Sequence, residues 1–104
     1  HHQQQALRNV TAAFRRAYEG AGHSGNWLSV SATLDEASIR LHQARPRDAL
    51  RILERYSDDE VQALSVYWRC RMLRARAAVH AALGRDRDAL DLFAEANRLE
   101  AEGG

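Results

Sequence analysis

The stretch Arg45-Pro46-Arg47-Asp48-Ala49-Leu50 returns forty residues later as Arg85-Asp86-Arg87-Asp88-Ala89-Leu90. Each copy ends one apolar segment and opens another, so the order helix, tight turn, helix occurs twice. Internal repeats with periods of about 20 to 50 residues are typical of stacked units, because a single unit cannot bury its apolar faces. The repeat therefore predicts two antiparallel helix pairs, over residues 26–56 and 57–101.

The rest of the chain has the same helical character. Apolar residues recur with the period of an α-helix, and no stretch shows the alternation of a half-buried strand. The pattern predicts an all-α fold of about five helices in one domain over residues 6–104. The first helix, residues 6–19, is expected to cap the first pair. Residues 1–5 are interpreted as the remnant of an affinity tag or as the result of a cut through a longer polypeptide.

The longest helix is predicted over Asp58–Leu83. Ser57 and Glu60 have the spacing of a capping box at its start, and Gly84 is expected to end it. The apolar residues of this segment form two stripes on nearly opposite sides. One stripe contains Val66, Cys70, Leu73, Ala77 and Ala81, and the other contains Leu64, Trp68, Met72, Ala75 and Val79. A helix that is apolar on two sides is expected to lie between two neighbours.

The second helix pair resembles the tetratricopeptide repeat (TPR) family. In that family a Gly-containing turn is followed by a small residue, a large residue and another small residue at helical spacing. These positions are occupied here by Gly84, Ala89, Phe93 and Ala96. In the first pair Ala49 and Leu53 match, and Ala44 replaces the glycine. The resemblance covers residues 27–99 and implies a right-handed stack of helix pairs whose concave side binds a peptide or a neighbouring domain.

The repeat departs from the family in its period, which is forty residues instead of about 34. We place the residues that exceed the family's period around residues 56–62 and in a lengthened helix over residues 58–83. An unrelated five-helix bundle is the alternative fold. Two repeats are also fewer than the roughly three that stable stacking needs. We therefore expect a homodimer, or a segment of a larger regulatory or scaffold protein.

The arginines of the long helix predicted over residues 58–83 are the main candidates for a binding site. No acidic residue occurs between Glu60 and Asp86. Arg71 and Arg74, with Tyr67, lie between the two apolar stripes on one side, and the TPR resemblance places them in the groove with Asp35, Ile39 and His42 nearby. Arg69 and Arg76 fall on the other side. Because a guanidinium offers two parallel donors to a carboxylate, the expected partner is a protein or an acidic peptide. In the alternative interpretation these arginines pair internally with the acidic last helix, which is predicted over residues 87–101.

Composition and motifs disfavour several other functions. The 104 residues include 15 Arg, no Lys and 14 acidic residues, and the net charge of +1 disfavours nucleic-acid binding. No nucleotide, cofactor or catalytic motif occurs, so the domain is interpreted as non-enzymatic and without a cofactor. The histidines lack ligand spacing and Cys70 is interpreted as a core residue, so no metal site is predicted. The absence of transmembrane and signal-peptide patterns predicts a cytoplasmic domain.

Trp27 is the aromatic residue most expected at the surface, because it starts a helix after a Gly-rich segment. There it would contact a partner. The main alternative function is an effector-sensing or dimerisation domain of a transcription regulator. Such a domain would have an apolar pocket between helices beside Trp27 or Tyr67.

Overall fold

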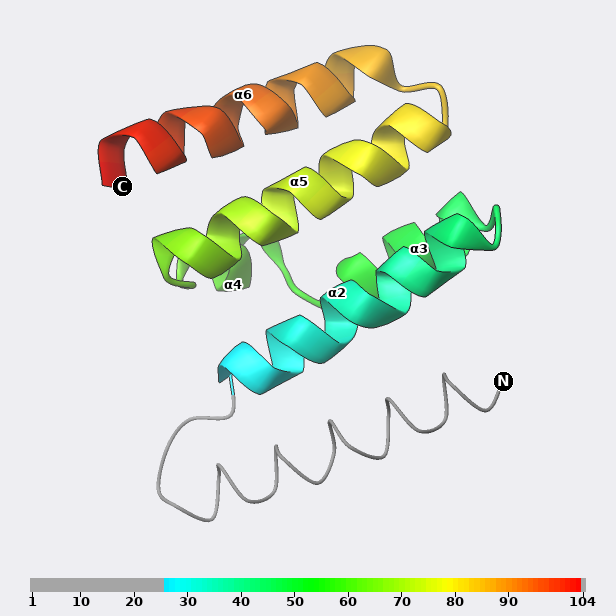
Figure 1. The fold of residues 1–104 in the computed structure, drawn as a ribbon, viewed down its shortest axis with the longest axis horizontal. Helices are drawn as coiled ribbons and strands as arrows, with labels where there is room; N and C mark the ends of the chain where they lie inside the picture. Colours follow the sequence, from blue (N-terminus) through cyan, green and yellow to red (C-terminus); the bar gives the residue numbers. More distant parts are fainter. Residues whose placement is uncertain (1–25, 104) are drawn as a thin grey trace. The chain divides into compact units, whose positions relative to one another are not determined.

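The computed structural model describes residues 26–103, and every element within them is a helix (Figure 1). The elements are α2 (Asn26–His42), α3 (Pro46–Leu53), α4 (Asp58–Gln62), α5 (Val66–Ala82) and α6 (Asp86–Gly103). This confirms the all-α prediction. The predicted capping helix over 6–19 and residues 1–5 lie outside the described residues. Two units of the chain meet between Ala32 and Thr33, within α2, so that residues 26–32 belong to the first unit and residues 33–103 to the second.

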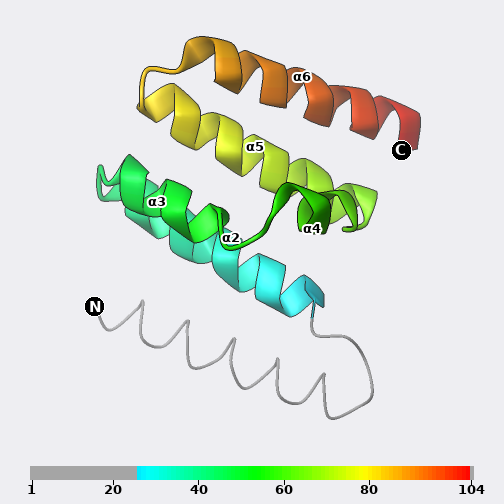
Figure 2. The same ribbon diagram turned by 180° about the vertical axis from the view of Figure 1, so that it is seen from behind.

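Within the second unit α5 is the central helix. It packs along α6 on one side and against α3 on the other, as the two opposite views show (Figures 1 and 2). The short helix α4 also packs against α5. No helix among the described residues is long and apolar enough to cross a membrane.

The forty-residue repeat is present in the helix boundaries. Helices α2 and α5 both have 17 residues, and α5 and α6 start forty positions after α2 and α3. The connecting turns share their hydrogen bonds as well. The backbone N–H of Arg45 donates to the carbonyl of Arg40 at 2.9 Å, and that of Arg85 donates to the carbonyl of His80 at 2.8 Å. The duplicated sequence therefore folds into duplicated local structure.

The prediction of one long helix over Asp58–Leu83 is wrong, because the segment forms two helices. The capping box predicted at Ser57 and Glu60 is present, but it starts only the five-residue helix α4. Ser65 is then extended, with φ −60° and ψ 158°, and α5 begins at the next residue. The extra residues of the forty-residue period therefore lie in α4 and its connections, and α5 is not lengthened. Helix α3 ends at Leu53, before the predicted end of the first helix pair at residue 56.

Both predicted stripes of α5 are covered along the middle of the helix. Cys70, Leu73 and Ala77 are buried on the first stripe, and the Cys70 thiol donates to the Ala96 carbonyl of α6 at 3.5 Å. Met72 and Val79 are buried on the second stripe. Ala81 is the exception, because it lies in the last turn of α5 beside an exposed loop. The expectation that α5 lies between two neighbours is confirmed.

Candidate functional site

Three of the predicted site residues line one pocket at the start of α5. This pocket, called the Arg71 pocket below, has a volume of about 280 Å³. Its lining consists of Val66, Tyr67, Cys70, Arg71, Arg74, Glu100 and Gly103. Gly103 lies so close to α5 that a Cβ there would come within 3.1 Å of Val66 Cγ1. The end of α6 thus closes one side of the pocket.

The guanidinium of Arg71 is held by aromatic side chains. Its central carbon lies 5.8 Å from the centre of the Tyr67 ring and 5.5 Å from the centre of the Trp68 ring. The two rings meet edge to face at 85°, with their centres 5.0 Å apart. Arg71 Nη1 donates to the Tyr67 hydroxyl at 3.0 Å. Arg71 forms no ion pair with any carboxylate of the described residues, so its other donors are free for a ligand.

Arg74 differs from Arg71 because it is paired within the fold. Its Nη2 forms an ion pair with Glu100 of α6 and donates to Asn97 Oδ1 at 3.2 Å. The hydrogen bond that Arg74 donates to the Glu100 carboxylate raises the pKa of the Arg74 guanidinium above its ordinary value. Arg74 therefore agrees with the alternative interpretation, in which the arginines pair with the last helix. Arg71 does not agree with it, because it forms no ion pair with α6.

Arg69 and Arg76 lie on the other side of α5, as the sequence predicts, and both contact α4. Arg69 Nη1 donates to Gln62 Oε1 at 3.5 Å. The Arg76 side chain is only 12% exposed, and its Nη1 lies 3.1 Å from Asp58 Oδ1. Its Nη2 donates to the carbonyls of Tyr56 at 2.7 Å and Leu53 at 3.4 Å. Arg76 therefore ties α5 to the end of α3 and to the residues that follow it, which is a structural role.

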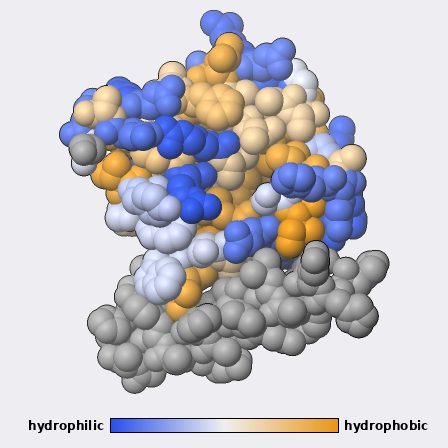
Figure 3. Space-filling view, viewed as in Figure 1, coloured by the Kyte–Doolittle hydropathy of each residue, from blue (hydrophilic) through white to orange (hydrophobic). Residues whose placement is uncertain are grey.

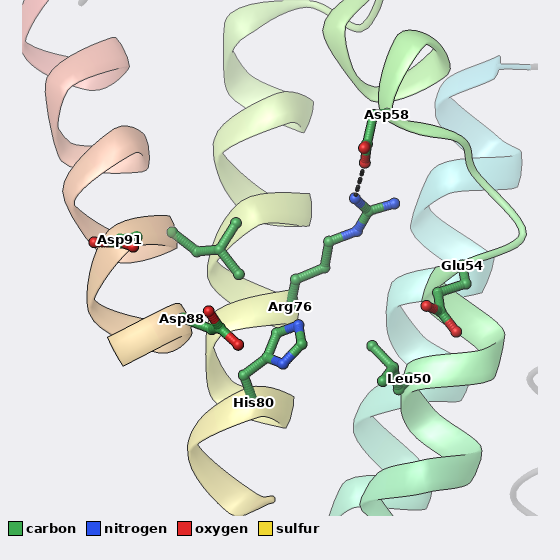
Figure 4. A pocket seen from close by; sticks show the side chains of 8 residues that line it. Leu50, Glu54, Asp58, Arg76, His80, Asp88 and Asp91 are labelled. Atoms are coloured by element: carbon green, nitrogen blue, oxygen red, sulfur yellow. Dashed lines mark hydrogen bonds and ion pairs between the residues drawn. The ribbon is translucent and has the colours of Figure 1, made fainter. Parts of the chain in front are cut away.

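A second pocket, the acidic pocket, lies on this Arg76 side between α3 and α6 (Figure 4). It has a volume of about 390 Å³ and is lined by Leu50, Glu54, Asp58, Arg76, His80, Asp88, Asp91 and Leu92. Figure 4 shows the Asp58 carboxylate turned to the Arg76 guanidinium. Sequence reasoning missed this pocket, because its carboxylates are far apart in the chain. Among residues 26–103 no group of three His, Cys, Asp or Glu side chains could hold a metal ion.

The α2 residues predicted near the arginines do not line the Arg71 pocket. A small apolar groove of about 130 Å³ joins α2, α3 and α5, and α2 contributes Leu34, Ala37, Ser38 and Leu41 to it. Asp35 and Ile39 are half-buried outside this lining, and His42 is exposed, with its Nδ1 2.8 Å from the Ser38 carbonyl. Trp27 is exposed in the first unit. A role for these four residues in binding a partner stays a prediction.

Comparison of the chain with protein-family models, with curated proteins and with solved structures gave no match.

Proposed function

We propose that this chain is a non-enzymatic protein-interaction domain of TPR-like type, which binds an acidic segment of a partner protein at the Arg71 pocket. The observation that supports the proposal most is the position of Arg71. Its guanidinium rests beside two aromatic rings, and no carboxylate of the described residues pairs with it. Arginine and exposed tyrosine are the residue types that contribute most to binding at protein interfaces.

The chemistry of the pocket fits a peptide carboxylate next to an apolar side chain. The aromatic rings restrict the guanidinium, so less side-chain entropy is lost when it binds a carboxylate in two-point geometry. Val66 and Cys70 give the pocket an apolar wall, and Tyr67 contributes a ring that is largely exposed. Two arginines around the same pocket, Arg71 and Arg74, favour an acidic ligand over a purely apolar effector.

The TPR-like part of the proposal is supported by the duplicated turns and by the forty-residue offset between the starts of the helices, although α3 has 8 residues and α6 has 18. In a right-handed stack of helix pairs the first helices of the pairs, α2 and α5, line the concave side. The Arg71 pocket would then open at the edge of that side. The short helix α4 is an insertion that the family pattern does not have.

The proposal is tested by selecting a random phage-displayed peptide library on the purified protein. We expect enrichment of peptides with two or more acidic residues next to an apolar one. Selected peptides are then titrated by fluorescence anisotropy against Arg71→Gln, Arg71→Lys and a control, Arg47→Gln. Arg47 is exposed on α3 and forms no ion pair among the described residues.

Arg71→Gln should weaken binding about tenfold or more, because a hydrogen bond between charged groups is lost. Arg71→Lys should restore only part of the affinity, since an ammonium cannot donate in parallel to both carboxylate oxygens. Arg47→Gln should leave the affinity unchanged. If no acidic peptide is enriched, or if Arg71→Gln binds as tightly as the unchanged protein, the assignment of this pocket is wrong.

A further inference from the structure

Two large apolar residues of α6, Leu90 and Phe93, are more exposed than Leu50 and Leu53, which lie forty residues earlier. Leu90 is 67% exposed and Phe93 is 36% exposed, whereas Leu53, the residue equivalent to Phe93, is fully buried. Ala94 and Ala101 are also exposed on α6. Figure 3 shows hydrophobic surface over α5 and α6 in the upper part of the view, bordered by hydrophilic residues. A second surface is therefore available at the end of the helix stack.

We infer that this face of α6 binds the same face of a second copy of the chain, with the two α6 helices antiparallel. Leu90, Ala94, Asn97 and Ala101 follow one another at spacings of four, three and four residues. That spacing places them in one line along a helix, as in the contact line of a coiled coil. In the antiparallel pair Leu90 faces Ala101 of the partner subunit, and Ala94 faces Asn97 of the partner subunit. The small alanines let the two helices approach closely.

Charge complementarity selects the second copy as the occupant and sets its direction. Asp91 and Arg98 each follow a residue of the contact line, so both lie on the same flank of α6. Antiparallel pairing puts Asp91 opposite the partner subunit's Arg98, and by symmetry Arg98 opposite the partner subunit's Asp91. Parallel pairing would instead bring Asp91 close to Asp86 of the partner subunit. The charges therefore favour the antiparallel arrangement and oppose the parallel one.

Both charged residues are available in the single chain. Asp91 forms no ion pair among the described residues. Arg98 pairs with Glu102 one turn away at 3.4 Å, and both side chains are more than half exposed. Such an exposed pair within one helix contributes little, so Arg98 can exchange it for a partner carboxylate.

Sedimentation velocity tests the inference, at protein concentrations up to about 0.5 mM because the apolar area is small and the affinity is expected to be modest. The unchanged protein should form a reversible dimer. Asp91→Arg and Arg98→Asp should each weaken dimerisation about tenfold or more, because each puts like charges face to face. The double variant Asp91→Arg/Arg98→Asp should recover the dimer, since both pairs form again with reversed signs.

Two further variants distinguish an effect at this face from a general effect of changed charge. Leu90→Glu should abolish the dimer, and Arg47→Asp on α3 should leave it unchanged. Circular dichroism of each variant checks that the helices remain folded. A protein that is monomeric at every concentration overturns the inference, and so does a double variant that dimerises no better than the single variants. If a helix of another protein occupies this face instead, the purified protein should be monomeric at every concentration.

Discussion

Ala44 and Gly84 occupy the same place in two copies of one turn, forty residues apart, and both have positive φ, 59° for Ala44 and 79° for Gly84. In each turn the next residue donates its N–H to a carbonyl in the last turn of the preceding helix. The geometry is that of a helix end closed by a left-handed residue. Glycine adopts this conformation without strain, whereas alanine does so at a cost of about 1 kcal/mol.

The first prediction follows from this difference. Ala44→Gly should raise the free energy of unfolding by about 0.5 to 1 kcal/mol, and Gly84→Ala should lower it by a similar amount. A Cβ at Gly84 would meet no atom within 4 Å, so the expected loss is backbone strain and not a clash. Urea unfolding followed by circular dichroism measures both. Shifts of the same sign in the two variants would contradict the proposed equivalence of the turns.

Arg76 gives a second prediction, on stability. Arg76→Met removes the donor to the Tyr56 and Leu53 carbonyls, and we expect the free energy of unfolding to fall by about 2 to 3 kcal/mol, because two hydrogen bonds donated by a charged side chain that is only 12% exposed are lost. Asp58→Asn should cost about 0.5 kcal/mol or less, since the Asp58 side chain is 96% exposed and an exposed ion pair contributes little. Equal losses in the two variants would show that the ion pair, and not the carbonyl contacts, matters most.

Much of the fold follows from local sequence signals. Single residues with strong local preferences set several helix boundaries. Gly84 follows the end of α5, Pro46 starts α3, and Ser57 provides the capping box of α4. The break before α5 was missed because no Gly or Pro marks it, and Ser65 alone is a weak signal. Helix periodicity placed Arg71 and Arg74 on one side of α5 correctly.

The surroundings of those arginines depend on tertiary packing and could not be read in the same way. A helical wheel gives the direction of a side chain and not the neighbour that it meets. The sequence therefore left open whether Arg74 would pair with the last helix, and the pairing with Glu100 follows only from how α6 lies along α5. The acidic pocket has the same origin, because Glu54 and Asp91 line one pocket only through the packing of α3 and α6 around α5.

Glu60 gives a prediction on pH. Its carboxylate accepts the backbone N–H of Ser57 at 2.9 Å, and this hydrogen bond lowers the pKa of Glu60 below its ordinary value. A group with a lowered pKa in the folded state stabilises the protein above its unfolded pKa, about 4.3 for glutamate, and the contribution is lost as the pH falls through the folded value. The free energy of unfolding should therefore fall less steeply in Glu60→Gln than in the unchanged protein as the pH is lowered through about 4. Parallel pH profiles for the two proteins would show that the capping box contributes no pH dependence.

The last prediction concerns Glu100, whose carboxylate already pairs with the Arg74 guanidinium. Glu100 lines the Arg71 pocket and pairs with Arg74, so it repels an acidic peptide and competes with it for the guanidinium. Glu100→Gln should raise the affinity for the selected acidic peptides by several-fold, up to about tenfold. Glu102→Gln is the matched control, because it makes the same charge change on the same helix, where Glu102 pairs with Arg98 outside the pocket lining. Its effect should be smaller and should disappear in high salt, since charges beyond about 10 Å are screened. An equal gain in both variants would mean that only the net charge of α6 matters, and an unchanged affinity in Glu100→Gln would remove Arg74 from the binding site.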